Sequence, residues 1–256
     1  MIDTHAHIFD DQFNEDIGEV IEHCKSVGIT HILLPNIDLC SIDAMLELSK
    51  LYPGYCLPMM GLHPCSVKKD NEAAMQTIEK WLGDEEFIAI GEMGTDLYWD
   101  KTYWPQQQEV FKRHCELAVN HKLPIVIHSR DSIDESIELV RPFINRGLTG
   151  VFHCFTGDID QGKQIMDMGF YLGIGGVVTF KNGGLDKVLP ELGITNLLLE
   201  TDSPYLAPVP NRGRRNSPTY LPLISEKIAN ILEISPLKVS EITDNNALAL
   251  FKLDEL

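Results

Sequence analysis

The chain has 256 residues, of which 44% are hydrophobic and 23% are charged, a composition typical of a globular protein that buries a sizeable core without disulfides. Its formal net charge of -17 excludes a broad basic face that coats nucleic acid, so any phosphate-binding group must be local. The six cysteines form no C-x-x-C pair and no zinc-ribbon spacing, which favours reduced, buried thiols and a cytoplasmic location.

Short aliphatic or β-branched runs alternate with longer stretches of helical periodicity, and this alternation predicts a parallel sheet with crossover helices. Strands are predicted at residues 2–4, 31–34, 56–59, 88–90, 125–127, 151–152, 170–173 and 196–199. A helix is predicted after each, at residues 14–27, 42–51, 72–82, 106–121, 133–145, 161–168, 184–191 and 220–232. Eight such units in a chain of this length predict an α/β fold, a single (β/α)8 TIM barrel domain over residues 1–256. Residues 236–251 are predicted to form an additional helix on the outside.

Barrel enzymes carry their reactive groups at the C-terminal ends of the strands, and residue types that bind metals follow five of the predicted strands. His5 and His7 follow the first strand, and their i, i+2 spacing directs both imidazoles to one side of an extended chain. The others are Glu92, His128, His153 and Asp202, after the fourth, fifth, sixth and eighth strands. Each residue alone has an ordinary structural explanation, but together they predict a metal site.

Four imidazoles and two carboxylates exceed what one tetrahedral zinc ion needs, so two divalent ions roughly 3.5 to 4 Å apart are expected. Glu92 lies midway in strand order between the two pairs of histidines, and we expect it to bridge the ions. Asp202 is expected to complete the first metal site and to accept a proton from the attacking water. The ligand types fit Zn²⁺, and carboxylates used with phosphate substrates also fit Mg²⁺ or Mn²⁺.

Other side chains near the strand ends are candidates for substrate binding. They are His63, Arg130, Lys181, Tyr205 and Arg214. His63 and Arg130 could equally be structural, and the basic stretch at residues 211–216 could be a solvated loop. Tyr205 or Phe155 could stack on a base. Four further histidines, His23, His31, His114 and His121, lie away from the strand ends and are expected to be structural or exposed.

Several motifs together resemble the TatD family of metal-dependent deoxyribonucleases, over nearly the whole chain. They are DTHAH at residues 3–7, GLHP at 61–64, GE at 91–92, HSR at 128–130, HCFTG at 153–157 and ETDSPYLAP at 200–208. The resemblance implies a divalent-metal phosphodiesterase that removes nucleotides from the 3′ end of DNA. It also implies a first metal held by His5, His7, Glu92 and Asp202 and a second held by Glu92, His128 and His153. The sequence departs from the family at residues 93–96 and at Arg214, where a lysine is usual.

The sequence leaves two other functions open. Related barrels cleave amides and aminoacyl esters with similar metal sets, although the basic residues 212–215 favour a phosphate-containing substrate. A non-catalytic protein that keeps the barrel as a scaffold is the third possibility, and the complete ligand set argues against it. For a nuclease, single-stranded ends of DNA, or of RNA, are expected rather than duplex interiors. We expect no membrane association, because no leader or apolar run of spanning length is present, and no obligate protein partner is evident.

Overall fold

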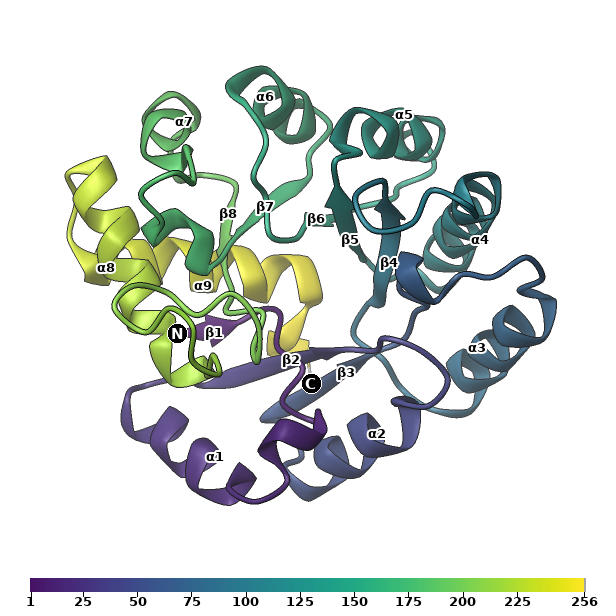
Figure 1. The fold of residues 1–256 in the computed structure, drawn as a ribbon, viewed down its shortest axis with the longest axis horizontal. Coiled ribbons are helices and arrows are strands. Elements are labelled where there is room, and N and C mark those ends of the chain that lie inside the picture. The colour runs from purple at the N-terminus through teal and green to yellow at the C-terminus, as the bar shows by residue number, and fades with distance from the viewer. Residues whose placement is uncertain (256) are drawn as a thin grey trace.

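The computed structural model describes residues 1–255, and within that range eight parallel strands lie at the centre of the molecule (Figure 1). They are β1 Ile2–Asp3, β2 His31–Pro35, β3 Cys56–Met59, β4 Ile90–Asp96, β5 Ile125–Arg130, β6 Gly150–Phe152, β7 Tyr171–Ile174 and β8 Leu197–Leu199. Neighbours in the chain pair within two sheets, β1 to β3 and β4 to β8. Parallel bridges from Met60 to Ile90 and from Ala6 to Ser203 join the sheets. The ring therefore closes, and the predicted barrel is confirmed.

A helix follows each strand and packs on the outside of the barrel (Figure 1). The helices are α1 Ile17–Ser26, α2 Ile42–Leu51, α3 Glu72–Asp84, α4 Trp104–His121, α5 Ile133–Ile144, α6 Ile159–Asp167, α7 Leu185–Leu192 and α8 Leu221–Leu232. Their bounds differ from the predicted ones by a few residues at most. Helix α6 begins earlier than predicted because Asp158 and Gln161 form a capping box at its start. Within residues 1–255, no helix is both long and apolar enough to cross a membrane.

Strands β4 and β5 extend further than the sequence predicts. We expected them to end at residues 90 and 127, but they stay paired through Gly94 with His128 and Asp96 with Arg130. The prediction was wrong because it read the first polar residue as the strand end, whereas Glu92 and Asp96 are themselves buried strand residues. Gly94 permits this pairing, since a Cβ there would lie only 1.9 Å from the His128 carbonyl oxygen.

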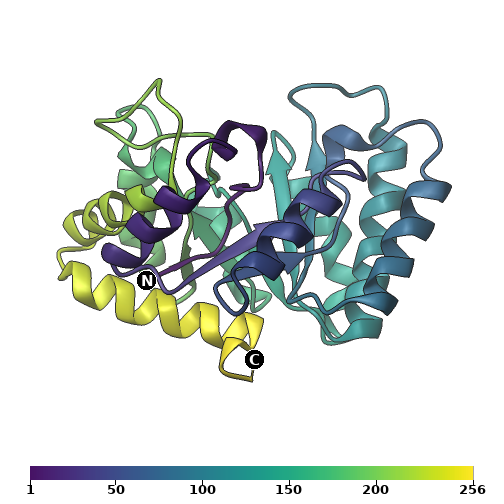
Figure 2. The same ribbon diagram turned by 90° about the horizontal axis from the view of Figure 1, so that it is seen from below.

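The predicted additional helix, α9 Pro236–Phe251, lies across the N-terminal end of the barrel (Figure 2). Its apolar side chains Ala247, Leu250 and Phe251 pack against residues at the start of the strands. Together with Leu253 these form what we call the apolar floor, which contains Ile2, Leu33, Leu57, Met59, Ile88, Ala89, Val126, Val151 and Leu198. Asp244 of α9 also accepts a hydrogen bond of 2.8 Å from the Ile2 amide. The floor fills one end of the barrel interior and leaves the C-terminal end for polar side chains.

Candidate metal centre

A buried carboxylate lies at the centre of the C-terminal end of the barrel. Glu92, on β4, is 2% exposed. Its Oε2 atom lies 3.2 Å from His5 Nε2 and 3.4 Å from His7 Nε2. Its Oε1 atom lies 2.9 Å from His128 Nδ1 and 3.2 Å from His153 Nε2. Each carboxylate oxygen thus faces a different group of imidazoles.

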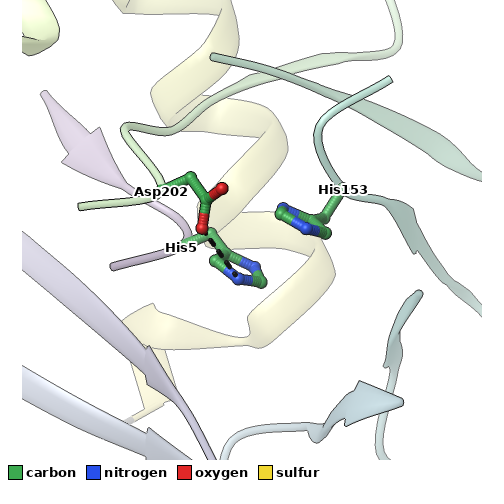
Figure 3. Close-up of side chains that lie close together, drawn as sticks. All are labelled: His5, His153 and Asp202. Carbon is green, nitrogen blue, oxygen red and sulfur yellow. Dashed lines mark ion pairs between the residues drawn. The ribbon is translucent and has the colours of Figure 1, made fainter. Parts of the chain in front are cut away.

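The first group consists of His5, His7 and Asp202. The two Nε2 atoms lie 3.2 Å apart, and they lie 3.8 and 3.6 Å from Asp202 Oδ1. Figure 3 shows His5 and Asp202 beside His153, whose ring stacks on that of His5 with 3.7 Å between centroids. These residues follow β1, β6 and β8, so closure of the barrel brings them together. With Glu92 Oε2 this group offers two nitrogens and two oxygens to a cation.

The second group consists of His63, His128 and His153. His63 Nε2 lies 3.4 Å from Glu92 Oε1 and 3.3 Å from His128 Nδ1. Its position is therefore comparable to that of the predicted ligands, although the sequence analysis predicted it to be either a substrate-binding or a structural residue. The ligand atoms of His63, Glu92 and His128 all lie within 4.8 Å of one another. The structure thus brings all six predicted metal-binding residues together and adds His63 to them.

The outer nitrogens of three of these histidines face hydrogen-bond acceptors. The pairs are His7 Nδ1 with Pro35 O at 3.1 Å, His128 Nε2 with Asp96 Oδ2 at 3.0 Å, and His153 Nδ1 with Glu200 Oε1 at 3.2 Å. A carbonyl or carboxylate can only accept, so with a cation at the centre the outer nitrogen of each imidazole would carry the proton. The inner nitrogen then presents its lone pair to the centre, which is the arrangement found around metal-binding histidines. The residues present therefore fit a metal ion.

At the metal centre, burial and neighbouring charges shift the pKa values of the ligands in opposite directions. Burial raises the pKa of Glu92, but the imidazoles of His63, His153 and His5 outweigh it and hold the pKa well below its ordinary value. Burial also lowers the pKa of His153, and here Glu200 and Glu92 outweigh it and raise the pKa. Burial raises the pKa of Asp202 to about 6. An ionised carboxylate among imidazoles is a donor set suited to hard or borderline divalent cations.

Asp3 holds the two ends of the barrel ring together beneath the first group. Its carboxylate accepts hydrogen bonds from Thr201 Oγ1 at 2.6 Å, from the Thr201 amide at 2.9 Å and from the His5 amide at 3.3 Å. Burial raises the pKa of Asp3 to about 7, against these hydrogen bonds. The residue thereby fixes the segment before His5 against the segment before Asp202.

Glu200 supports the second group from below. It is 1% exposed, and its Oε1 atom accepts a hydrogen bond of 2.6 Å from the Cys154 amide as well as facing His153. The space for its carboxylate exists because residue 173 is glycine, where a Cβ would lie 2.2 Å from Glu200 Oε2. In the sequence Glu200 stands out only as the first residue of the motif at 200–208, whereas its burial beneath His153 indicates a positioning role.

A cavity of about 750 Å³ lies above both groups of ligands. His63, Arg130 and Tyr205, predicted to contact substrate, all line it, and Tyr205 is 46% exposed. Lys181 and Arg214 are exposed and do not contribute to the walls of this cavity as residues 1–255 define them. The structure therefore places three of the five predicted substrate residues at the cavity.

The basic stretch at residues 212–215 is partly structural. Arg215 donates to Asp16 and to the Gln12 carbonyl oxygen, and its guanidinium lies 4.3 Å from the Phe13 ring centroid. Arg212 lies 3.7 Å from the ring centroid of Phe180. These two arginines contact residues of the protein itself and hold the loop in place.

Two other predictions concern buried rings. His114 is fully buried, its Nδ1 atom lies 2.8 Å from the Val110 carbonyl, and its Nε2 accepts from the Leu62 amide at 3.2 Å. Its expected structural role is confirmed, and it positions the loop that carries His63. Phe155 is 3% exposed within the core, so the interpretation that it stacks on a base is wrong.

Comparison with known proteins agrees with this geometry. The family model described as TatD related DNase matches residues 2–252. The chain belongs to this family. It is therefore an enzyme, a metal-dependent hydrolase of the TatD type that acts on ester bonds.

Two relatives and one solved structure illustrate the similarity. An uncharacterized metal-dependent hydrolase of Bacillus subtilis, YabD, is 36% identical over 255 residues, which covers 99% of this chain and 100% of the relative. The 3′-5′ ssDNA/RNA exonuclease TatD of Edwardsiella piscicida is 31% identical over 259 residues, which covers 99% of this chain and 100% of the relative. The crystal structure of the TatD homologue YjjV from Escherichia coli has a TM-score of 0.93 at 24% identity and covers 98% of each chain. The last comparison supports the TatD-type barrel fold.

Proposed function

We propose that this TatD-family hydrolase is a 3′-5′ exonuclease that uses two divalent ions to remove nucleotides from single-stranded ends of DNA, or of RNA. The observation that carries the proposal is Glu92, whose two carboxylate oxygens each face a separate group of imidazoles. The similarity to the 3′-5′ ssDNA/RNA exonuclease TatD of Edwardsiella piscicida supports the choice of substrate. Two-metal sites with a shared carboxylate are suited to phosphodiester hydrolysis.

We assign the proposed ligands to two ions. His5, His7 and Asp202 with Glu92 Oε2 would hold the first, and His128 and His153 with Glu92 Oε1 would hold the second. His63 adjoins the second position and could bind either that ion or a substrate oxygen. When bound, Mg²⁺, Mn²⁺ or Zn²⁺ lowers the pKa of water toward neutrality and neutralises charge on the phosphoryl oxygens.

The protein's own groups supply orientation and proton transfer. Asp202 is the ligand with the most exposed side chain among the carboxylates, at 14%, and it lines the cavity. We assign to its carboxylate the acceptance of a proton from the attacking water. Arg130 and Tyr205 line the same cavity and are placed to hold a phosphate and the terminal base.

The shape of the cavity favours a strand end. A volume of about 750 Å³ is within the range that holds one small ligand, so an unpaired terminal nucleotide fits where a duplex does not. Lys181 and Arg214 are exposed outside the cavity, and we propose that they meet phosphates further along a longer strand. Their effect should then depend on substrate length and on salt.

Digestion of a short, 5′-labelled single-stranded DNA by metal-stripped protein tests this function. Mg²⁺, Mn²⁺ or Zn²⁺ is added back separately, and the same strand in a blunt duplex serves as the control. We expect a ladder that shortens from the 3′ end with at least one metal and much slower digestion of the duplex. No cleavage with any metal would refute the nuclease and shift the proposal to aminoacyl ester or amide substrates at the same site.

A further inference from the structure

Two large aromatic side chains project from the loop between β4 and α4, at the edge of the metal-centre cavity. Tyr98 is 51% exposed and Trp99 is 67% exposed. Their rings meet edge to face, with 4.9 Å between centroids and 86° between planes. Trp99 lines the cavity. A tryptophan this exposed gains little from packing within the fold, so its open face is available to a ligand.

The aromatic pair is held in a fixed relation to the metal centre by Asp96. The Oδ1 atom of Asp96 accepts hydrogen bonds of 2.9 Å from the amides of both Tyr98 and Trp99. Its Oδ2 atom lies 3.0 Å from His128 Nε2. Gln107 fixes the backbone of Asp96 in turn, through a hydrogen bond of 2.9 Å from the Asp96 amide. One buried carboxylate therefore connects the exposed rings to a histidine of the second group.

A positive charge lies directly beside the rings. The guanidinium carbon of Arg130 is 3.8 Å from the ring centroid of Tyr98 and 5.2 Å from that of Trp99. Stacking on Tyr98 restrains the guanidinium plane, so its N–H groups are oriented in advance for a phosphate. An open indole face can stack on a nucleic-acid base, and a nearby guanidinium can bind the phosphate attached to that nucleotide.

Trp99 also forms a wall shared between two cavities. Beside the main cavity lies a smaller one of about 360 Å³. Besides Trp99, its walls include the largely apolar side chains Pro64, Val67 and Tyr103, together with Lys68 and Asp100. A strand whose last nucleotide occupies the metal centre would therefore reach this second cavity next to the indole ring.

We propose that Trp99 is a stacking subsite for the unpaired base of the nucleotide adjacent to the one held at the metal centre, and that Arg130 binds the phosphate between them. The proposal deepens the nuclease function proposed above and rests on it. Stacking on any base would make the subsite tolerant of sequence, and pairing of that base would block it. The subsite thus selects single strands at a position outside the metal centre.

Kinetics of the metal-loaded enzyme test the subsite. The substrates are a labelled eight-residue oligothymidylate, the same strand with an abasic residue at each of the three 3′-terminal positions in turn, and bis-nitrophenyl phosphate. For Trp99→Ala we expect the ratio of kcat/KM on the oligonucleotide to kcat/KM on the small diester to fall about tenfold, mostly through KM. Trp99→Phe, which keeps an aromatic face, should restore most of that ratio.

The abasic series identifies the partner of the indole ring. In the wild-type enzyme one abasic position next to the terminus should raise KM about tenfold, and in Trp99→Ala that penalty should disappear. Leu51→Ala is the matched control, since Leu51 is 65% exposed at the end of α2 and remote from the cavity, and it should change neither value.

The two proposals fail in different ways. The subsite is refuted, while the nuclease function stands, if Trp99→Ala retains the wild-type ratio of the two kcat/KM values. It is also refuted if the abasic substrates raise KM for Trp99→Ala as much as they do for the wild-type enzyme. If the wild-type enzyme hydrolyses the small diester but no oligonucleotide, the nuclease function is refuted and the subsite with it.

Discussion

The two ends of the barrel interior use the same strands for opposite purposes. At the N-terminal end, Ile2 and Leu198 pack under Phe251 in the apolar floor. A few residues after the ends of the same two strands lie His5, which is fully buried, and Asp202, whose side chain is 14% exposed. Burial of apolar groups stabilises the fold, whereas burial of carboxylates and imidazoles costs free energy unless each is paired. The comparison teaches that the floor supplies stability that the metal centre does not.

The largest effect should come from removing the carboxylate between the two groups of ligands. Glu92→Ala should lower kcat on bis-nitrophenyl phosphate at least about a thousandfold, because both ion positions lose a ligand. Metal content by mass spectrometry should fall in parallel.

The control for this prediction is Glu226→Ala, which removes an exposed carboxylate on α8. It should leave rate, metal content and stability unchanged. Retention of more than a few per cent of the wild-type rate by Glu92→Ala would exclude the bridging role of Glu92 and weaken the contrast between the two ends.

The second prediction concerns a substitution in the apolar floor. Phe251→Ala should lower the free energy of unfolding by about 3–5 kcal/mol, because it leaves a cavity among well-packed apolar side chains. Where the variant is still folded, kcat and KM should stay within about twofold of the wild-type values. Urea unfolding gives the first quantity and initial rates at low temperature give the second.

Leu237→Ala on the same helix is the matched control, because Leu237 is 79% exposed. Its effect on unfolding should be below about 0.5 kcal/mol. A loss of activity per folded molecule in Phe251→Ala would mean that the floor also shapes the metal centre, which would blur the division between the ends.

A smaller effect, on metal affinity, is expected from a substitution beside the metal ligands at the polar end of the barrel. Asp96→Asn removes the negative charge that faces His128 Nε2 but keeps an oxygen that can accept from the amides of Tyr98 and Trp99. Metal affinity, measured by calorimetric titration, should fall about 10- to 100-fold. Asp43→Asn, an exposed change in α2, should not alter it. Unchanged affinity in Asp96→Asn would show that His128 needs no outer partner.

The fold could be predicted from sequence because apolar runs and helical periodicity alternate so regularly. Helix α2 has the predicted bounds, and α9 was expected as an extra helix. The position of α9 across the end of the barrel could not be predicted from sequence. Its apolar residues indicate that one face of the helix is buried, but they do not indicate which part of the molecule that face packs against. The ends of β4 and β5 were also missed, because polar residues that continue a strand look the same in sequence as polar residues that end one.

The candidate site was predictable where ligand types directly follow apolar strands, as for His128 and His153. His63 lies further along its loop, and its place beside Glu92 depends on His114, which is remote in sequence. Asp96 was noted only within residues 93–96, where the sequence departs from the family. Trp99 was missed because an aromatic residue in a loop gives no signal of exposure, which only the three-dimensional structure supplies.

The contact between Gly173 and Glu200 bears on how this enzyme can vary in sequence. Any side chain at position 173 would displace the carboxylate that orients His153, although Gly173 itself carries no functional group. In saturation mutagenesis, Gly173 would therefore tolerate substitution as poorly as a metal-binding residue does. A residue can be invariant over evolutionary time purely for the volume that it leaves empty.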